Sequence, residues 1–581
     1  MSTKLMAISS VRISTREPSS LTSSWPCTYQ SSRISLQMSK STTLYSKSAA
    51  LNHEVLTHPL DRDSKSLSEL QCRIQKLLRN SADPKGTVKL IDTVQRLGIT
   101  HHFQEEIDSL LEHMYISEWD AGEDLFATAL QFRLLRHNGF PVSADVFKKF
   151  MHKMRNYKDT WGMLSLYEAS HMGTEEEDIL VEAMELTREH LLESIPHLNP
   201  QVGRDVSGSL TLPRQFRMAR LEARNYIDEY SQENNHIIAL LDLAKLDYNM
   251  LQSLHQRELA HIIRWWKELG LVDKLGFARD RPTECFLWAV GIFPDSHYSS
   301  CRIELTKTVC ILLVMDDIFD TYGSFHELVH FTEATKRHAL LIFLYLYVTE
   351  KWDLDAMEHL PEYMKICYMA LYNTTNEISY RVLKEHGWTV VSHLKKTWID
   401  IFEAYLAEAK WFNSGYIPKF EEYLVNGVTS SGSYMALVHS FFLIGDGLSR
   451  ESVSTMRPYP RLFSCSGEIL RLWDDLGTSS EEQERGGDGA CSIQCHMREN
   501  NISDERQGRE YVRQLIRKLW MELNGLAMSS TALPPSIAKA SVNMARTAQV
   551  IYQHGDDRSG YSVDDYVQAL LFTPFHFQDP S

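Results

Sequence analysis

The sequence predicts an all-α protein with two helical domains, and three observations support this fold class. Apolar residues recur with the period of an α-helix in segment after segment from about residue 61 onward. Alternating apolar and polar runs, which are typical of half-buried strands, are nearly absent. The Asn-Gly pairs at 138, 426 and 524, which elsewhere form hairpin turns, each stand where a helical segment is expected to close.

The predicted helices follow in order along the chain. Leu67, Leu70, Ile74 and Leu78 share one face of a first helix, and a second helix ends at Gly98. Further helical periods cover residues 125–135, 179–192, 237–254 and 259–269. Residues 196–213 contain many turn formers and few apolar residues, so we predict a loop there. The domain boundary follows this loop, which predicts an N-terminal domain of residues 61–228 and a C-terminal domain of residues 229–581.

The first fifty residues differ in composition from the rest. They contain 15 Ser, six Lys or Arg and one acid, Glu17, for a net charge of +5. They have no apolar run of roughly 7 to 15 residues, which excludes a secretory signal. A Ser-rich, basic and acid-poor segment is typical of an organelle transit peptide, so we assign residues 1–50 to one. The alternative is a tail that carries no address.

The overall composition restricts the partners of this chain. Its 581 residues, 43% hydrophobic, can form large cores, and the net charge of -16 argues against nucleic acid. No apolar run approaches the roughly 20 residues of a membrane span. The nine cysteines have no framework spacing and predict reduced thiols, and Cys491, Cys495 and His496 lack a second pair to complete a zinc site. Nothing in the sequence signals an oligomer, so we expect a monomer.

The stretch TVCILLVMDDIFDTYG, residues 308–323, joins an apolar helix to three carboxylates. Asp316 and Asp320 are four residues apart and would share one helix face, with Asp317 about 100° away. Carboxylates at the end of a helix repel one another and the partial negative charge of the last carbonyl groups. We therefore expect a cation to bind here.

A second acidic set lies in LRLWDDLGTSSEEQERGG. Asp474, Thr478 and Glu482 are spaced by four residues, so their oxygens can converge on one ion. If the two acidic helices face each other, they form an all-oxygen site that suits Mg²⁺ or Mn²⁺. Mg²⁺ commonly shares its coordination shell with phosphates, which predicts a phosphate-bearing ligand. A solvated acidic helix end is the alternative for either motif taken alone.

Arginines near both motifs could bind that phosphate. Arg279 and Arg281 precede a helix in GFARDRPTECFLW, and Arg471 precedes Asp474 by three positions. Guanidinium groups bind phosphate oxygens bidentately, although isolated arginines more often form surface salt bridges. Cations around a diphosphate would stabilise it as a leaving group, and its departure would produce a carbocation.

An apolar, aromatic cavity would tolerate such a carbocation. The candidate wall residues, each also compatible with an ordinary core position, are Trp288, Tyr405, Phe441, Phe442 and Tyr561. No G-x-x-x-x-G-K-[ST] phosphate loop occurs, which argues against a nucleotide-binding P-loop, and no nucleophile-elbow serine presents itself.

With these motifs the chain resembles the plant terpene synthases. DDIFD is similar to their DDxxD motif, DDLGTSSEE to their second metal motif (N/D)Dxx(S/T)xxxE, and RDR at 279–281 to their RxR. LEARNYIDEY, HQRELAHIIRWW and YQHGDD agree as well, so the resemblance extends from about residue 61 to the end.

The resemblance implies an N-terminal α-barrel remnant and a C-terminal class I bundle that binds a three-ion Mg²⁺ cluster. The metal ligands would be Asp316, Asp317, Asp320, Asp474, Thr478 and Glu482. Asp316, Asp320 and Asp474 would also take part in catalysis and in diphosphate binding, together with Arg279, Arg281 and Arg471. No D-x-D-D motif occurs, so protonation-initiated chemistry is not expected.

Two departures from the family pattern are informative. Cyclising monoterpene synthases usually carry RRx8W after the transit peptide, but this chain has no Arg-Arg pair. The family often reads RGDVPKSIQC after its second metal motif, whereas this chain reads RGGDGACSIQC, with Cys491 where a diphosphate-contacting lysine is common. Both departures resemble the subfamily that makes acyclic terpene alcohols.

The resemblance therefore implies a monoterpene synthase of the plastid stroma that ionises geranyl diphosphate and adds water, giving linalool. One open alternative is a nerolidol or dual linalool/nerolidol synthase that uses farnesyl diphosphate, and another is a different acyclic product such as geraniol, ocimene or myrcene. A chain-elongating prenyl transferase is disfavoured by Thr478 and Glu482, and an inactive helical scaffold by the complete ligand set.

Overall fold

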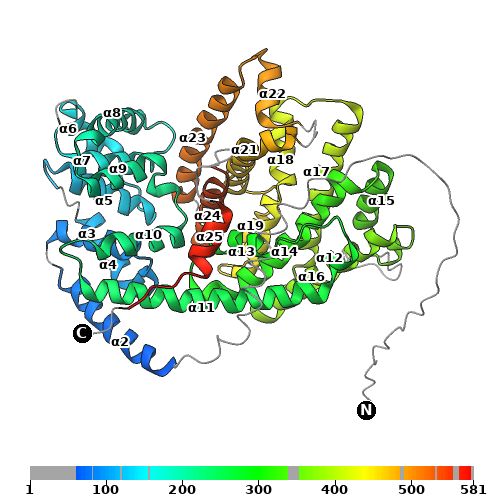
Figure 1. Ribbon diagram of the computed structural model, residues 1–581, viewed down its shortest axis with the longest axis horizontal. Coiled ribbons are helices and arrows are strands. Elements are labelled where there is room, and N and C mark those ends of the chain that lie inside the picture. The colour runs from blue at the N-terminus through cyan, green and yellow to red at the C-terminus, as the bar shows by residue number, and fades with distance from the viewer. Residues whose placement is uncertain are drawn as a thin grey trace. The chain divides into compact units, whose positions relative to one another are not determined.

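The computed structural model describes residues 60–81, 83–117, 121–154, 157–337, 352–484, 490–529, 533–553 and 562–577, with side chains left out at 60–65 and 479–484. These residues are helical and contain no β-strand, which confirms the predicted all-α class (Figure 1). The predicted transit peptide, residues 1–50, and Tyr561 lie outside the described residues, as does the side chain of Glu482.

The N-terminal part confirms the four helices predicted before residue 196. Acidic side chains start two of them, because Asp83 accepts hydrogen bonds from the N–H groups of Lys85 and Gly86, and Asp124 accepts one from Ala127. The elements of this part are α2 (Leu60–Arg79), α3 (Pro84–Arg96), η1 (Thr100–His102), α4 (Gln104–Ile116), α5 (Leu125–His137), η2 (Ala144–Phe147), α6 (Lys148–Met151), α7 (Thr160–Ser170), α8 (Asp178–Ser194), η4 (Ile195–His197), α9 (Pro200–Thr211), η5 (Arg214–Phe216) and α10 (Ala219–Ser231).

The prediction of a loop over residues 196–213 was wrong, because α9 occupies most of it. Asn199 caps this helix by accepting a hydrogen bond from the Val202 N–H, and Pro200 takes the first helical position, where its missing N–H costs nothing. Val206 is buried on its inner face. Local capping and this packing outweigh the weak helix propensity of its two glycines.

The C-terminal part begins with one long helix where two segments were predicted. α11 runs without a break from Ile238 to Leu269. The elements that follow are α12 (Leu271–Lys274), α13 (Pro282–Ile292), η6 (Ser296–Tyr298), α14 (Ser299–Asp317), η7 (Ile318–Tyr322), α15 (Phe325–Lys336), η8 (Asp355–Met357), α16 (Glu362–His386), α17 (Val391–Ser414), α18 (Phe420–Ser430), α19 (Ser433–Ile444), α20 (Arg450–Ser454), α21 (Arg461–Glu484), α22 (Ser492–Glu499), α23 (Glu505–Ser529), α24 (Pro535–Tyr552) and α25 (Val563–Leu571).

Two of the three Asn-Gly pairs do not close a helix as predicted. Asn138 does end α5, but the pairs at 426 and 524 lie inside α18 and α23. At Gly427 the reason is a close approach, because a Cβ atom there would lie 3.0 Å from Cγ of Arg471 on α21. Glycine is therefore used at this position for packing rather than for a turn.

The described residues form four hydrophobic cores, and α11 contributes side chains to two of them. Its first half, including Ala239 and Tyr248, packs with α2, α3 and α10, whereas Trp266 near its end packs with residues of α14 and α17. The remaining cores lie among α5–α9 and among α13, α19, α21 and α24. The boundary at 228/229 stays a prediction.

The C-terminal segment after α25 lies along α11 (Figure 1). Asn249 accepts a hydrogen bond from the Phe575 N–H at 2.8 Å and donates its amide to the Phe575 carbonyl at 2.8 Å. Gln256 and Tyr248 donate to the carbonyls of Leu571 and Ala569. These bonds fix residues 569–575 to α11, the helix that contributes side chains to two of the cores.

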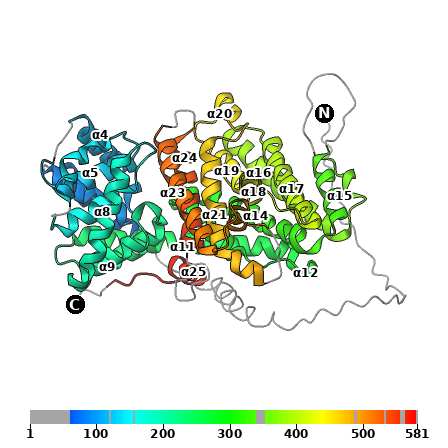
Figure 2. The ribbon, with the colours of Figure 1, turned by 90° about the horizontal axis from the view of Figure 1, so that it is seen from above.

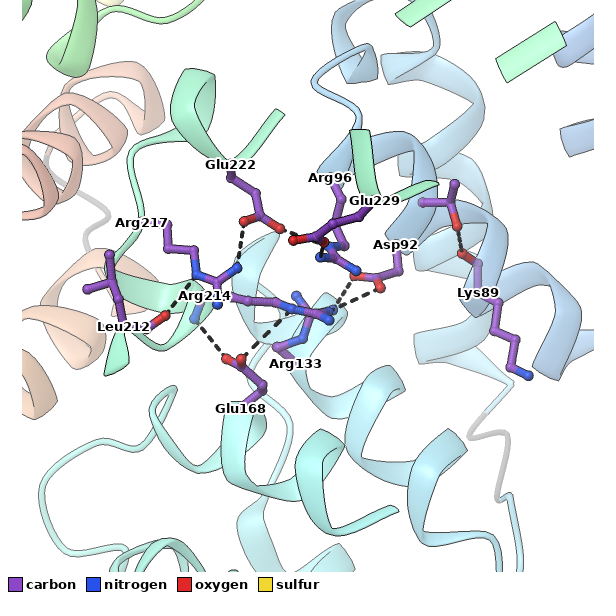
Figure 3. Close-up of polar contacts among 11 residues, drawn as sticks. Lys89, Asp92, Arg96, Arg133, Glu168, Leu212, Arg214, Arg217, Glu222 and Glu229 are labelled. Carbon is purple, nitrogen blue, oxygen red and sulfur yellow. Dashed lines mark hydrogen bonds and ion pairs between the residues drawn. The ribbon is translucent and has the colours of Figure 1, made fainter. Parts of the chain in front are cut away.

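Charged side chains form a second kind of interior in the N-terminal part (Figure 3). Glu222 on α10 binds Arg96 at 2.9 Å and Arg217 at 2.7 Å, while Arg214 lies between Asp92 and Glu168. All of these side chains are at most one-fifth exposed, so their charges stabilise one another away from bulk water.

The helices that carry the acidic motifs belong to one bundle. α14 packs on α13, α16 and α19, and α21 packs on α18, α19, α23 and α24 (Figure 2). Arg302 on α14 is fully buried and forms a bidentate ion pair with Glu258 on α11, at 2.8 and 2.7 Å. This ion pair fixes the position of α14 along the axis of α11.

In the part of the chain that the structure describes, no helix is both long and apolar enough to cross a bilayer. The eight described cysteines are free thiols, as the sequence predicted. Cys491 and Cys495 are buried, and His496 stacks on Tyr511 with ring centroids 3.5 Å apart.

Candidate active site

The first acidic motif lies where α14 changes from an α-helix to a π-helical turn, η7. The N–H of Gly323 bonds the carbonyl of Ile318, five residues earlier, at 2.8 Å. The α-helical spacing assumed for Asp316 and Asp320 is therefore not present, because Asp320 lies inside the wider turn. The two side chains are still neighbours, since the charge of Asp316 raises the pKa of Asp320.

Asp320 has an unusual electrostatic environment. Its side chain is open to solvent, yet surrounding protein removes enough hydration to raise its pKa. Desolvation, then the charge of Asp316, then that of Glu408, together raise the pKa of Asp320 to about 8. Glu408 comes from α17, and burial raises its pKa as well. The carboxylates of three helical segments thus face one space.

Arg279 connects the RDR segment to the first acidic motif. Its guanidinium binds Asp316 through Nη2 and lies 2.6 Å from Oδ1 of Asp317 through Nε. Its backbone N–H also donates to Oδ2 of Asp317 at 2.9 Å. Both oxygens of Asp317 are thus engaged by Arg279, whereas the side chain of Arg281 is exposed where α13 begins.

Arg471 has the corresponding place on α21. It donates from Nε to the Tyr423 hydroxyl at 2.8 Å and pairs with Asp475 at 2.8 Å and Asp474 at 3.4 Å. Asp475 is buried and also accepts hydrogen bonds from the Tyr423 hydroxyl and from the Ser492 N–H. This carboxylate therefore positions Arg471, while Asp474 and Arg471 keep partial exposure.

Tyr552 on α24 relates the two acidic motifs to each other. Its hydroxyl hydrogen-bonds to Asp474, and the charges of both Asp474 and Asp316 help burial to raise its pKa. Arg471 in turn acts on the pKa of Asp320. Asp316 on α14 and Asp474 on α21 thus both lie close enough to Tyr552 to act on its pKa.

Of the other residues that the sequence analysis proposed, some lie near the acidic motifs and others lie in the hydrophobic core. Thr478 follows Asp474 by one turn and donates to its carbonyl at 2.9 Å. Trp288 lies beside Tyr552, with ring centroids 6.0 Å apart, and burial with the charges of Asp316 and Asp320 raises the pKa of Tyr405. Phe441 and Phe442 are fully buried in the bundle core.

The donor set fits a hard divalent cation. Asp316, Asp320, Asp474 and Thr478 offer only oxygen atoms, and nearby Glu408 adds negative charge. At Asp320, desolvation and the charges of Asp316 and Glu408 outweigh the opposing effect of Arg279 and Arg471 and raise the pKa to about 8. Added positive charge would stabilise the ionised form of Asp320.

Three residues of this site were missed by sequence reasoning. Glu408 lies in YLAEAKW, Asp475 is the second acid of DDLG, and Tyr552 is the first residue of YQHGDD. Isolated polar residues in helices carry no spacing signal. Asp475 alone could have been found, since an acid next to Asp474 is turned about 100° toward the buried side.

One open groove among the described residues lies apart from the acidic motifs. It has a volume of about 900 Å³ and runs between α17, α18 and the segment Met456–Tyr459. Charged side chains of both signs line it, including Lys396, Asp400 and Lys419. None of its lining residues belongs to either acidic motif or is Arg279 or Arg471, so this groove is separate from the candidate active site.

Two family models match most of this chain. Residues 267–522 match the family described as "Terpene synthase family, metal binding domain", and residues 35–210 match "Terpene synthase, N-terminal domain". The first match contains Arg279 and both acidic motifs.

Several plant enzymes are similar over most of the chain. A chloroplastic monoterpene synthase of Cananga odorata is 56% identical, over 90% of this chain and 87% of its own. Geraniol synthase and R-linalool synthase of Ocimum basilicum, both chloroplastic, are 51% and 50% identical, over 86% and 89% of this chain and 85% and 88% of theirs.

A solved structure has the same architecture. Isoprene synthase from grey poplar, in complex with three Mg²⁺ ions and dimethylallyl-S-thiolodiphosphate, superimposes with a TM-score of 0.82 at 35% identity. The alignment covers 89% of this chain and 98% of that one.

Proposed function

The chain belongs to the terpene synthase family, and from this premise we propose that it is a monoterpene synthase that ionises geranyl diphosphate and adds water to the cation, with linalool as main product. The observation that carries this proposal is the common space around Tyr552, which Asp316 and Asp474 approach from different helices. A diphosphate there would meet Arg279 and Arg471 from opposite motifs.

The metal ligands in this proposal are Asp316, Asp320, Asp474, Thr478 and Glu482, with Asp317 held by Arg279 beside them. Three Mg²⁺ ions bound by them, or Mn²⁺ with the same preference for oxygen, would neutralise the charge that develops on the leaving diphosphate. The oxygen-only donor set and the three Mg²⁺ ions in isoprene synthase support this assignment.

The chain's own residues bind and orient the substrate. Arg279 and Arg471 are held by carboxylates and present guanidinium groups to diphosphate oxygens, and Arg281 adds a charge at the entrance. Trp288, Tyr405 and Tyr552 surround the space with aromatic rings that can stabilise a carbocation. Buried Cys491, whose pKa burial raises to about 12, stays a neutral thiol and binds no diphosphate.

The product assignment depends on water reaching the cation before a ring closes. The absence of an Arg-Arg pair and the similarity to an R-linalool synthase support an acyclic alcohol. Geraniol is the second candidate, because geraniol synthase is as similar to this chain as linalool synthase is. Water then attacks the primary rather than the tertiary carbon of the same allylic cation. The basic, Ser-rich first fifty residues and the chloroplastic relatives support action in the plastid stroma.

Purified protein with Mg²⁺ and either geranyl or farnesyl diphosphate, followed by chiral gas chromatography, tests this function. We expect linalool from geranyl diphosphate and no product without divalent metal. A predominantly cyclic product would contradict the acyclic assignment, geraniol would select the second candidate, and activity on farnesyl diphosphate alone would contradict the substrate.

A further inference from the structure

A second cluster of metal-ligating side chains lies in the N-terminal core, away from the acidic motifs. His101 and His102 end η1, and Asp247 comes from α11. Nε2 of His101 is 3.0 Å and Nε2 of His102 is 2.9 Å from the same atom, Oδ1 of Asp247. One donor atom from each of the three residues lies within 4.8 Å of the others.

The other carboxylate oxygen of Asp247 marks this cluster as unsatisfied. Asp247 is 8% exposed, and its buried Oδ2 atom has no hydrogen-bond partner among the residues that the structure describes. Nη1 of Arg220 is 3.7 Å from this oxygen, beyond hydrogen-bonding distance, and the guanidinium of Arg220 lies over the ring of Tyr248. A buried carboxylate oxygen without a donor is costly, and a bound cation would remove that cost.

We propose that His101, His102 and Asp247 bind a first-row transition metal ion, zinc by preference, at a site separate from the diphosphate site. Two imidazoles and one carboxylate are a ligand set for zinc, whereas Mg²⁺ prefers oxygen alone. Ligand atoms around tetrahedral zinc lie about 3.3 Å apart, so the present separations need to open by only a few tenths of an ångström. Three protein ligands leave the fourth position for water.

The surroundings of His102 suit a metal ligand. Nε2 of Gln71 on α2 lies 2.9 Å from Nδ1 of His102. With its amide turned by half a rotation, Gln71 would accept the Nδ1–H proton and leave Nε2 free for the metal. Such a partner on the second ring nitrogen is what fixes the tautomer of a metal-bound histidine.

Binding of this ion would connect distant parts of the chain. His102 and Asp247 are 145 positions apart in the sequence. His102 lies in η1, between α3 and α4, whereas Asp247 lies on α11, which contributes side chains to two cores. A ligand that binds only the folded arrangement raises its stability. The expected role is structural, holding α11 against the N-terminal helices.

The test uses the full chain, freed of metal by chelator and dialysis, with Zn²⁺ as the probe. Excess Mg²⁺ is present throughout so that the acidic motifs are occupied. Zinc stoichiometry and affinity are measured by calorimetry, and zinc-dependent stabilisation by the shift in Tm. The variants are His101→Gln and Asp247→Asn. The matched control is the double variant His326→Gln/His330→Gln, which removes an exposed histidine pair on α15 whose Nε2 atoms lie 3.0 Å apart.

We expect one zinc per wild-type chain, at least about tenfold weaker binding in His101→Gln and in Asp247→Asn, and no change in the control. Zinc should raise Tm in the wild type and in the control only. Absence of zinc binding by the wild type, unchanged affinity in His101→Gln, or loss of binding in the control would each overturn the proposal. If Asp247→Asn does not fold, the zinc affinity of His101→Gln alone tests the proposal. Visible absorption of bound Co²⁺, expected in the wild type and lost in His101→Gln, gives a second measurement.

Discussion

At the residue scale, the charged side chains of the proposed diphosphate site differ in whether an oppositely charged partner lies beside them. Arg279 is shared between Asp316 and Asp317, and Arg471 between Asp474 and Asp475. Among the described residues, Asp320 forms no comparable ion pair, and its pKa rises to about 8 because surrounding protein removes hydration and because Asp316 and Glu408 are negatively charged. The excess negative charge is therefore located on the side of the site where the proposed metal ions bind.

Replacement of one carboxylate in each acidic motif should show that both are needed. We predict that Asp316→Asn and Asp474→Asn each lower kcat on geranyl diphosphate by on the order of 100-fold or more, because each removes charge that would bind cation and diphosphate. Steady-state rates at saturating Mg²⁺ measure this. Asp178→Asn, at an exposed position on α8, is the control and should keep wild-type rates. Normal rates in either motif variant would contradict a shared site.

Tyr552 is expected to act as a positioning residue through its hydrogen bond to Asp474. In Tyr552→Phe we predict that the Mg²⁺ concentration for half-maximal activity rises by about tenfold, because the carboxylate loses the group that orients it. A magnesium titration of activity measures the change. Tyr416→Phe, which removes an exposed hydroxyl bound to Glu422, is the matched control. A purely structural role would lower Tm but leave the magnesium midpoint where it is.

At the scale of helices, the site depends on how closely α21 and α24 approach. A Cβ atom at Gly477 would lie 2.9 Å from the carbonyl oxygen of Tyr552 and 3.1 Å from its Cβ. Glycine is therefore required at this position, one residue before Thr478, so that both helices can bring Asp474 and Tyr552 together.

Gly477→Ala should separate these two helices. We predict a destabilisation of about 1–3 kcal/mol from overpacking, accompanied by loss of most activity because Tyr552 moves from Asp474. Gly203→Ala on α9 is the matched helical control, since its added Cβ would meet only Leu198, 4.0 Å away. The control should be neutral or slightly more stable. Equal stability of the two variants, measured by urea unfolding, would refute the close-approach argument.

The charge network of the N-terminal helices predicts a dependence of stability on pH. Burial raises the pKa of Glu222, but the guanidinium groups of Arg217 and Arg96 outweigh burial and lower the pKa well below its usual value of 4.5. A carboxylate with a lowered pKa stabilises the folded state above the unfolded pKa, and this contribution is lost as pH falls through the folded pKa.

Glu222→Gln should therefore destabilise the protein most at neutral pH, by roughly 3 kcal/mol, because two buried arginines lose their partner. The difference in Tm between the wild type and Glu222→Gln should narrow as pH falls below about 4.5. Asp228→Asn, on the same helix but in an exposed pair with Arg224, is the control and should change little. A constant difference between pH 7 and pH 4 would refute the assigned role of Glu222.

The period of apolar residues predicts the all-α class and several individual helices, because it depends on residues a few positions apart. α2, α3, α5 and α8 have this origin. The predictions that were wrong concern features that depend on contacts between residues far apart in the sequence. α9 forms over weak helix formers because it packs through Val206, and η7 departs from α-helical spacing at Asp320. Glu408 and Tyr552 could not be found because only the fold brings α17 and α24 to the acidic motifs.

For the whole molecule, α11 is the element that connects the core of the N-terminal helices with the core that contains α14 and α17. It buries Tyr248 in one core and Trp266 in another, binds the C-terminal segment through Asn249, and fixes α14 through Glu258. The proposed zinc site at Asp247 lies on the same helix. We infer that the position of α14, and with it Asp316, depends on contacts made along the entire length of α11.

The central claim is that two acidic motifs from different helices form one cation-dependent diphosphate site. Calorimetry of the full chain with inorganic diphosphate, with and without Mg²⁺, tests it most directly. We predict heat of binding only when Mg²⁺ is present, and its loss in Asp316→Asn and in Asp474→Asn alike. Diphosphate binding of equal strength without Mg²⁺, or retained in either variant, would contradict the claim.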